Sequence, residues 1–164
     1  MVRLETLLSE GKISKISELE LGRYANFFEA SFKDNLECSK FTSERFPRWS
    51  IIAGYYSMHD ITKLLLAKKF RVKIELEVHA TTIKVLRELI KNREILRLIE
   101  EGYKEFISLA NDLAEAKDQR TKAQYYTGTA FMREHYQKIS GEFFSSIVEP
   151  YIEKIKDLLG EKND

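Results

Sequence analysis

Residues 51–70, IIAGYYSMHDITKLLLAKKF, decide the fold that we expect for this chain. Apolar side chains in this stretch recur with helical spacing on two faces. One face holds Ile51, Tyr55, Met58, Thr62 and Leu65, and the other holds Ile52, Tyr56, His59, Lys63 and Leu66. Because a helix that is apolar on two faces is usually central in a bundle, this stretch predicts a central helix. Ser43 is its expected N-cap, and Pro47 lies near its first turn.

The rest of the chain predicts more helices around this one. Helical spacing of apolar residues extends over about 17–38, 79–92, 93–126 and 130–159. We expect Gly102 to break or kink the fourth helix and Pro150 to kink or divide the last one. The predicted fold is all-α: an up-and-down antiparallel bundle of four main helices with a kinked C-terminal helix. It forms a single domain over residues 1–164.

Residues 70–78, FRVKIELEV, break the helical pattern because apolar and charged side chains alternate strictly. A period of two indicates extended backbone. The chain shows no second strand that would pair with it. We therefore expect an extended connector that pairs with its copy in a second subunit, with more helix as the alternative.

Composition excludes several classes of protein. The 164 residues carry a net charge of +1, which leaves no overall field to attract nucleic acid, so any such contact is a local patch. No apolar run approaches the roughly 20 residues of a membrane span, and the expected compartment is the cytoplasm. The single cysteine, Cys38, is expected to be a small core residue, with a reactive thiol as the alternative.

Common motifs for metals, phosphates and nucleophiles do not occur in the sequence. The three histidines, His59, His79 and His135, are far apart and form no metal-binding pattern. There is also no glycine-rich phosphate loop and no serine in a nucleophile elbow. We expect neither a metal nor a cofactor.

Two stretches carry a resemblance to a known family. Residues 51–70 resemble the second helix of HEPN domains (higher eukaryotes and prokaryotes nucleotide-binding), which carries an Ala-x-Tyr-Tyr-Ala-Met pattern followed by leucines. The matching residues are Ala53, Tyr55, Tyr56, Met58, Leu64, Leu65 and Leu66. Ser57 replaces the usual alanine, and His79 stands where the family often has a histidine. The stretch 120–126, RTKAQYY, is similar to the family's Arg-x-x-Ala-Asp-Tyr signature. The resemblance covers about residues 20–155.

Membership would imply a four-helix bundle that is often homodimeric and often associates with a small nucleotidyltransferase. Many other members are metal-independent ribonucleases or toxins with an Arg-x4–6-His motif. Here the spacing after Arg120 reaches Tyr125 instead of histidine, and Gln124 stands where aspartate is common. Because tyrosine has a pKa near 10 and histidine one near 6.5, tyrosine is a poor base at neutral pH. Arg120 suits gripping a phosphate, and Tyr125 or Tyr126 suits stacking on a base.

Geometry constrains this candidate site. On a continuous helix Tyr125 lies about 140° around the axis from Arg120, so the two converge only if the helix loosens or a second subunit completes the site. The alternative for Arg120 is a surface ion pair with Asp118 or Glu115.

The other candidate ligand residues are Tyr55, Tyr56, His59, Lys63 and His79. The alternative for the tyrosines and histidines is packing or capping, and for Lys63 it is a solvated surface. His59 and Asp60 are neighbours on one helix and point about 100° apart, so they are not expected to form a catalytic pair.

The expected function is a nucleotide- or RNA-binding HEPN-type module that acts with a nucleotidyltransferase-like partner, in a toxin–antitoxin or RNA-related system. One alternative is a metal-independent ribonuclease in which His59 or His79 replaces the missing histidine. The other alternative is a structural interaction bundle without a ligand.

Overall fold

The computed structural model describes residues 4–122 and 129–160, and side chains between 110 and 133 are outside that description. Most of these residues are helical, which confirms the all-α prediction. In chain order the elements are α1 (Leu4–Ser9), β1 (Ile13–Lys15), α2 (Glu18–Thr42), α3 (Pro47–Phe70), β2 (Val72–Ile74), α4 (Val78–Leu89), α5 (Arg93–Lys122), α6 (Thr129–Phe143), a π-helical turn (Phe144–Val148) and α7 (Glu149–Leu159).

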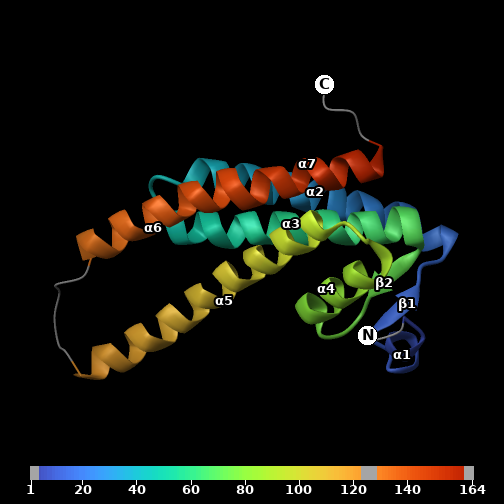
Figure 1. Ribbon diagram of the computed structural model, residues 1–164, viewed down its shortest axis with the longest axis horizontal. Helices are drawn as coiled ribbons and strands as arrows, with labels where there is room; N and C mark the ends of the chain where they lie inside the picture. Colours follow the sequence, from blue (N-terminus) through green and yellow to red (C-terminus); the bar gives the residue numbers. More distant parts are fainter. Residues whose placement is uncertain (1–3, 123–128, 161–164) are drawn as a thin grey trace.

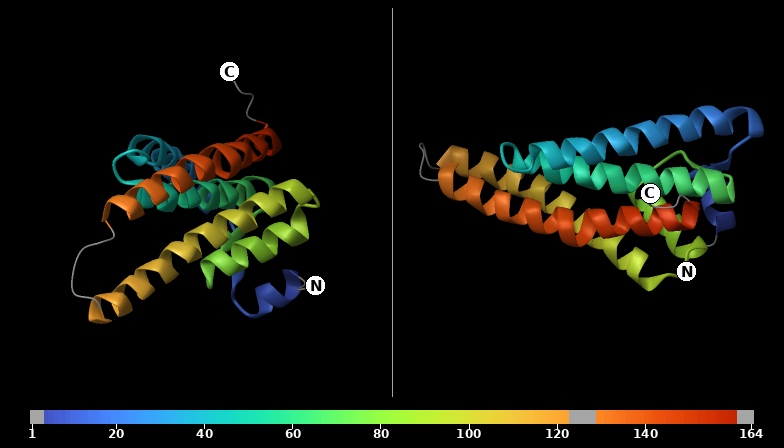
Figure 2. Two further views of the ribbon diagram at one scale, coloured as in Figure 1. Left: turned by 60° about the vertical axis from the view of Figure 1, so that its left-hand side comes forward. Right: turned by 90° about the horizontal axis from the view of Figure 1, so that it is seen from above.

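The predicted central helix is α3, and the prediction of its central place is confirmed. It runs antiparallel to α2 and also packs against α4, α5, α6 and α7, so that most of its residues are buried. Figures 1 and 2 show α2, α3 and the α6–α7 pair side by side, while α5 crosses α3 obliquely. The side chains between these helices form the larger of two hydrophobic clusters.

The turn between α2 and α3 differs from its prediction. Pro47 is the first residue of α3, as expected, but Phe46 is the N-cap residue. Ser43 is instead the C-cap of α2, in right-handed helical conformation, and its hydroxyl donates to the Lys40 carbonyl. The prediction of Ser43 as N-cap is wrong because α2 continues to Thr42, four residues beyond its predicted end at Cys38, and Ser43 caps that helix instead. Cys38 is exposed, so its prediction as a core residue is also wrong.

The extended connector is confirmed in its central part, but the predicted pairing is wrong. β2 pairs antiparallel with β1 of the same chain, with Ile13 opposite Ile74 and Lys15 opposite Val72. The three residues of β1 are too few to show a period of two, so the sequence pattern did not predict this strand. The small sheet, α1 and α4 enclose a second hydrophobic cluster that contains Leu7, Ile13, Leu66, Ile74 and Val85.

The two predicted irregularities in the last helices turned out differently. α5 runs through Gly102 without a break. The glycine instead allows close packing on α3, because a Cβ at this position would lie 3.0 Å from the Met58 side chain. Before Pro150 the helix adopts the π-helical turn, so the predicted disturbance is present but the helical path continues. Proline lacks an N–H and crowds the preceding turn, which favours such a widened turn. Over the described ranges, none of the helices has the length and apolar character required to cross a membrane.

Candidate functional site

Four of the predicted site residues meet where α3, α4 and α5 converge. Tyr55 and Tyr56 are adjacent on α3, His59 lies about one turn further along it, and His79 comes from the first turn of α4. The ring centroids of His59 and His79 are 4.8 Å apart, and those of Tyr56 and His79 are 5.9 Å apart. The fold therefore brings together residues that are up to 24 positions apart in the sequence.

Two residues of α5 complete this ring cluster, and the sequence analysis missed both. Phe106 stacks on Tyr55 at 4.6 Å between centroids and meets Tyr56 edge-on at 5.7 Å. Tyr103 stacks on His79 at 6.1 Å. We call Tyr55, Tyr56, His59, His79, Tyr103 and Phe106 the ring cluster. Tyr103 and Phe106 lie three residues apart on the apolar side of α5. This spacing is equally typical of core packing, so the sequence did not mark them as site residues. Only the fold shows which rings they contact.

The interior of the ring cluster is closed, and its rim is open. Tyr55 is fully buried and His59 is 2% exposed, whereas Tyr56, His79, Tyr103 and Phe106 are each half-buried. Some surface of the four rim residues therefore meets water, whereas the two interior rings do not.

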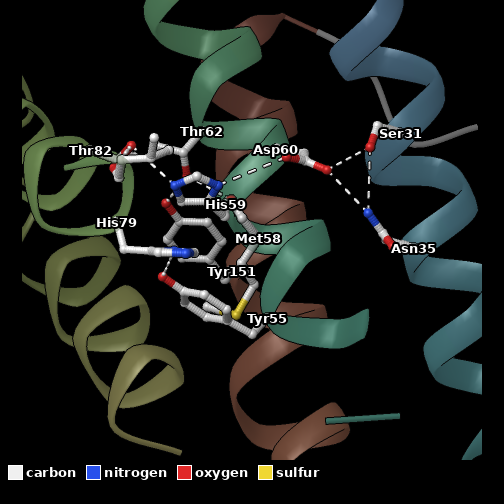
Figure 3. A network of polar contacts seen from close by, with 11 residues as sticks. Ser31, Asn35, Tyr55, Met58, His59, Asp60, Thr62, His79, Thr82 and Tyr151 are labelled. Atoms are coloured by element: carbon white, nitrogen blue, oxygen red, sulfur yellow. Dashed lines mark hydrogen bonds and ion pairs between the residues drawn. The ribbon is translucent and has the colours of Figure 1, made fainter. Parts of the chain in front are cut away.

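A hydrogen bond joins the interior to the rim: the Tyr55 hydroxyl lies 2.9 Å from His79 Nδ1 (Figure 3). Burial raises the pKa of Tyr55 far above its ordinary value, so the phenol keeps its proton. Burial, and then the neighbouring His59, lower the pKa of His79. A neutral His79 that receives the phenol proton at Nδ1 carries its own proton on Nε2.

His59 is held as a neutral imidazole. Its Nε2 lies 3.2 Å from the Thr82 hydroxyl, which itself donates to the Val78 carbonyl at 2.7 Å. Since that hydroxyl has only one proton, His59 Nε2–H is the donor in the first contact. Nδ1 has no hydrogen-bond partner, because Asp60 Oδ1 lies 3.8 Å away, beyond hydrogen-bond range. Burial lowers the pKa of His59, and the opposing pull of Asp60 is smaller.

Asp60 belongs to the other side of α3. Its Oδ2 accepts from Ser31 at 2.6 Å and from Asn35 at 3.1 Å, both on α2 (Figure 3). Its hydrogen bonds are thus to α2, although Oδ1 stays 3.8 Å from His59 Nδ1. This carboxylate ties α2 to α3 and does not orient a catalytic histidine.

Lys63 also leans toward α2. Its ammonium lies 4.7 Å from the centroid of the Phe28 ring, and burial lowers its pKa. Nearby cations are engaged with acids: Lys68 pairs with Glu29, and Arg71 pairs with Glu18. Lys63, Lys68 and Arg71 are thus occupied by ion pairs or a ring contact.

The second predicted centre is the stretch 120–126. Gln124, Tyr125 and Tyr126 lie outside the described residues, and so does the side chain of Arg120. The backbone of Arg120 is on α5, fourteen residues beyond Phe106, which places it about 21 Å along the helix axis from the ring cluster. Within one chain, Arg120 and the ring cluster are therefore two separate places.

One hollow of the described part lies away from the ring cluster. A cavity of about 380 Å³ lies between α1, the sheet and the end of α4, and it is lined by Leu4, Leu8, Ile13, Ser14, Lys15, Phe70, Arg71, Val72 and Leu89. Over residues 4–122 and 129–160, no three His, Cys, Asp or Glu side chains gather where they would hold a metal ion.

Comparisons of the chain with protein-family models, with curated proteins and with solved structures found no match. The resemblance to HEPN domains stays a prediction from the residues quoted above.

Proposed function

We propose that this chain is a HEPN-type module that binds a nucleotide or RNA and acts with a nucleotidyltransferase-like partner in a toxin–antitoxin or RNA-related system. In this proposal the rim of the ring cluster holds a base. Arg120, with Tyr125 and Tyr126, forms a second anion-binding place further along α5.

One observation supports this proposal most: four half-buried rings, Tyr56, His79, Tyr103 and Phe106, gather where α3, α4 and α5 converge. Rings that are fixed in position and partly open to water suit stacking on bases, which contributes about 1–3 kcal/mol per base. The neutral imidazole of His79 adds a polar group that donates through Nε2 to a base edge or a phosphate. Stacking needs neither a metal nor a deep pocket.

Binding is testable with Tyr103→Ala. We expect this change to weaken binding of uridine monophosphate or a short oligouridylate about tenfold, because it removes one stacking surface. Isothermal titration calorimetry measures the affinity, and thermal unfolding checks that the variant folds. Phe27→Ala is the matched control, since Phe27 is an exposed aromatic residue on α2. Equal affinities for the wild type and Tyr103→Ala would remove the ring cluster from the site.

The same proposal includes the assembly. Helices α2, α3, α5 and the α6–α7 pair would be the four main helices of a HEPN-like bundle, and two copies would form a homodimer. Sedimentation equilibrium tests this, with an expected mass of twice the 19.2 kDa chain. A small nucleotidyltransferase encoded beside this chain would support the paired-module function.

A second candidate function is a metal-independent ribonuclease, and the proximity of His59 and His79 favours it. To accept a proton from a 2′-hydroxyl at Nε2, a neutral His79 at the rim would take the other tautomer, in which Nδ1–H donates to the Tyr55 oxygen. RNA cleavage in the presence of EDTA, lost in both His79→Ala and Arg120→Ala, would establish this function over binding alone. The structural-bundle alternative would be correct if neither nucleotides nor RNA bind.

A further inference from the structure

A stripe of half-open and open side chains leads away from the ring cluster along α3. Trp49, Ile52 and Tyr56 follow one another at helical spacings of three and four, so they share one face of the helix. Trp49 is 64% exposed, and Ile52 and Tyr56 are half-buried. Figure 1 shows the reason: α5 packs on the middle of α3 and then diverges from the end that begins at Pro47.

The turn at the far end of this stripe adds one more ring and two cations. Phe46 is 57% exposed, and Arg45 and Arg48 are exposed on either side of it. Neither arginine forms an ion pair with a described residue; the Arg48 guanidinium lies 5.7 Å from the centroid of the Tyr136 ring. Some other arginines hold acids closely, as Arg87 holds Glu100 at 2.7 Å and Arg97 holds Glu101 at 2.6 Å.

Open rings beside two arginines suit a strand with bases and phosphates; Arg45 has no ion pair with a described residue, and the Arg48 guanidinium contacts only the Tyr136 ring among them. Bases stack on exposed aromatic rings, while phosphates attract guanidinium groups. Exposed apolar rings also cost solvation free energy, which a covering ligand recovers. The charge of this turn disfavours a basic partner, although Glu44 reduces it by one unit.

We propose that the ligand is a single-stranded RNA of several nucleotides that runs from the ring cluster along Tyr56, Ile52 and Trp49 to Arg45 and Arg48. This inference rests on the proposed function and extends it, because it assigns the size and direction of the ligand. Trp49 lies seven residues before Tyr56, about 10 Å along α3, so one base cannot stack on both rings. A mononucleotide therefore fills only the ring cluster.

Trp49 is the only tryptophan in the chain, and its fluorescence reports directly on this stripe. We expect a decanucleotide of uridine to quench the emission of Trp49 on binding. We expect uridine monophosphate to bind, as calorimetry would show, without quenching it. Titrations at low and high salt should show weaker binding of the decanucleotide at high salt, because its phosphates contact cations.

Two variants separate the stripe from the ring cluster. Trp49→Ala should weaken the fluorescein-labelled decanucleotide about tenfold in anisotropy titrations while leaving uridine monophosphate unchanged. Phe27→Ala is its control, because Phe27 is also 64% exposed but lies on α2. Arg45→Gln should weaken the decanucleotide severalfold, whereas Lys69→Gln, which removes one charge at the other end of α3, should not.

The results distinguish failure of this inference from failure of the proposed function. If the decanucleotide binds and Tyr103→Ala weakens it, but Trp49 is neither quenched nor needed, the RNA path along α3 is wrong and the ring cluster stands. If no nucleotide or RNA binds at all, both proposals are wrong. If anionic lipid vesicles quench the emission of Trp49 and RNA does not, the inference is wrong in favour of a membrane. If the emission of Trp49 shifts to shorter wavelength only as the protein concentration rises, it is wrong in favour of a second copy.

Discussion

At the scale of single residues, His59 shows how burial fixes a protonation state. The ring is enclosed between α3 and α4, donates to Thr82 and leaves Nδ1 without a hydrogen-bond partner. Protonation would place a charge where little water reaches it, so burial lowers the pKa. The unfolded chain has no such restriction and binds a proton near pH 6.5.

This difference predicts a pH dependence of stability. Because His59 and His79 have lowered pKa values in the fold, the unfolded state binds more protons below about pH 6.5, and stability falls as the pH falls. We expect the free energy of unfolding to decrease from pH 7 to 5.5, by at most about 1.4 kcal/mol per pH unit for each proton. In His59→Gln, whose side-chain amide is able to donate to Thr82, the free energy of unfolding should decrease less over this pH range. Urea unfolding at several pH values measures this.

The control for the pH experiment is Gly22→Ala, a helix substitution that changes no titratable group and meets nothing within 4 Å. This variant should keep the pH dependence of the wild type. The chosen range stays above the ordinary carboxyl pKa values near 4, so carboxylates contribute little. Parallel curves for the wild type and His59→Gln would contradict the assignment of a neutral buried His59.

The sequence predicted some site residues and not their surroundings. Tyr55, Tyr56 and His79 were candidates from the resemblance and His59 from its place on the same helix, and the fold gathers all four. Tyr103 and Phe106 could not be found in advance, because helical spacing tells which side of α5 they share and not which ring faces them.

At the scale of elements, Gly54 sets how closely α3 approaches its neighbours. A Cβ at this position would lie 3.0 Å from Ser39 Oγ on α2 and 3.0 Å from Val148 Cγ2 in the π-helical turn. Both partners are fully buried, and Ser39 is fixed by its hydrogen bond to the Ser50 carbonyl. These neighbours have little room to yield.

Gly54→Ala is therefore expected to destabilise the protein by about 1–3 kcal/mol, because overpacking outweighs the better helix propensity of alanine. Gly22→Ala is the matched control: it also lies within a helix, but nothing would meet its Cβ within 4 Å. That change should stabilise the protein by roughly 0.5–1 kcal/mol. Urea unfolding of both variants measures the difference, and a neutral Gly54→Ala would contradict the close packing.

Long helices were predictable and short elements were not. The two apolar faces of α3 predicted its central position, because periodicity over 20 residues is a strong signal. β1, with three residues, has no such signal, and its pairing with β2 depends on about 60 intervening residues. Ser43 failed as a predicted cap because a serine between two helices suits either the end of one or the start of the next.

At the scale of the whole molecule, two hydrophobic clusters of unequal size meet on α3. Leu66 lies in the smaller cluster and neighbours Leu65 of the larger one, and Phe70 packs against both. The smaller cluster holds α1 and the two-stranded sheet to the bundle. A two-stranded sheet is only marginally stable without such packing.

Leu7→Ala tests how strongly this smaller cluster holds the N-terminal elements. Leu7 is 1% exposed, so we expect a loss of about 2–4 kcal/mol. Leu8→Ala on the same helix is the control, because Leu8 is 39% exposed and should lose roughly 1 kcal/mol or less. Hydrogen exchange should accelerate at the amides of β1 and β2 in Leu7→Ala. Equal effects of the two changes would mean that α1 contributes little to the fold.

The sequence by itself determined the helical class, the central place of α3 and the extended segment before α4, because each depends on local periodicity. Only the tertiary structure decided the strand that pairs with β2, the rings that α5 contributes to the ring cluster, and the separation of Arg120 from that cluster. These depend on which faces meet across long stretches of chain. That choice is made by packing and burial of the whole core, which local spacing does not encode.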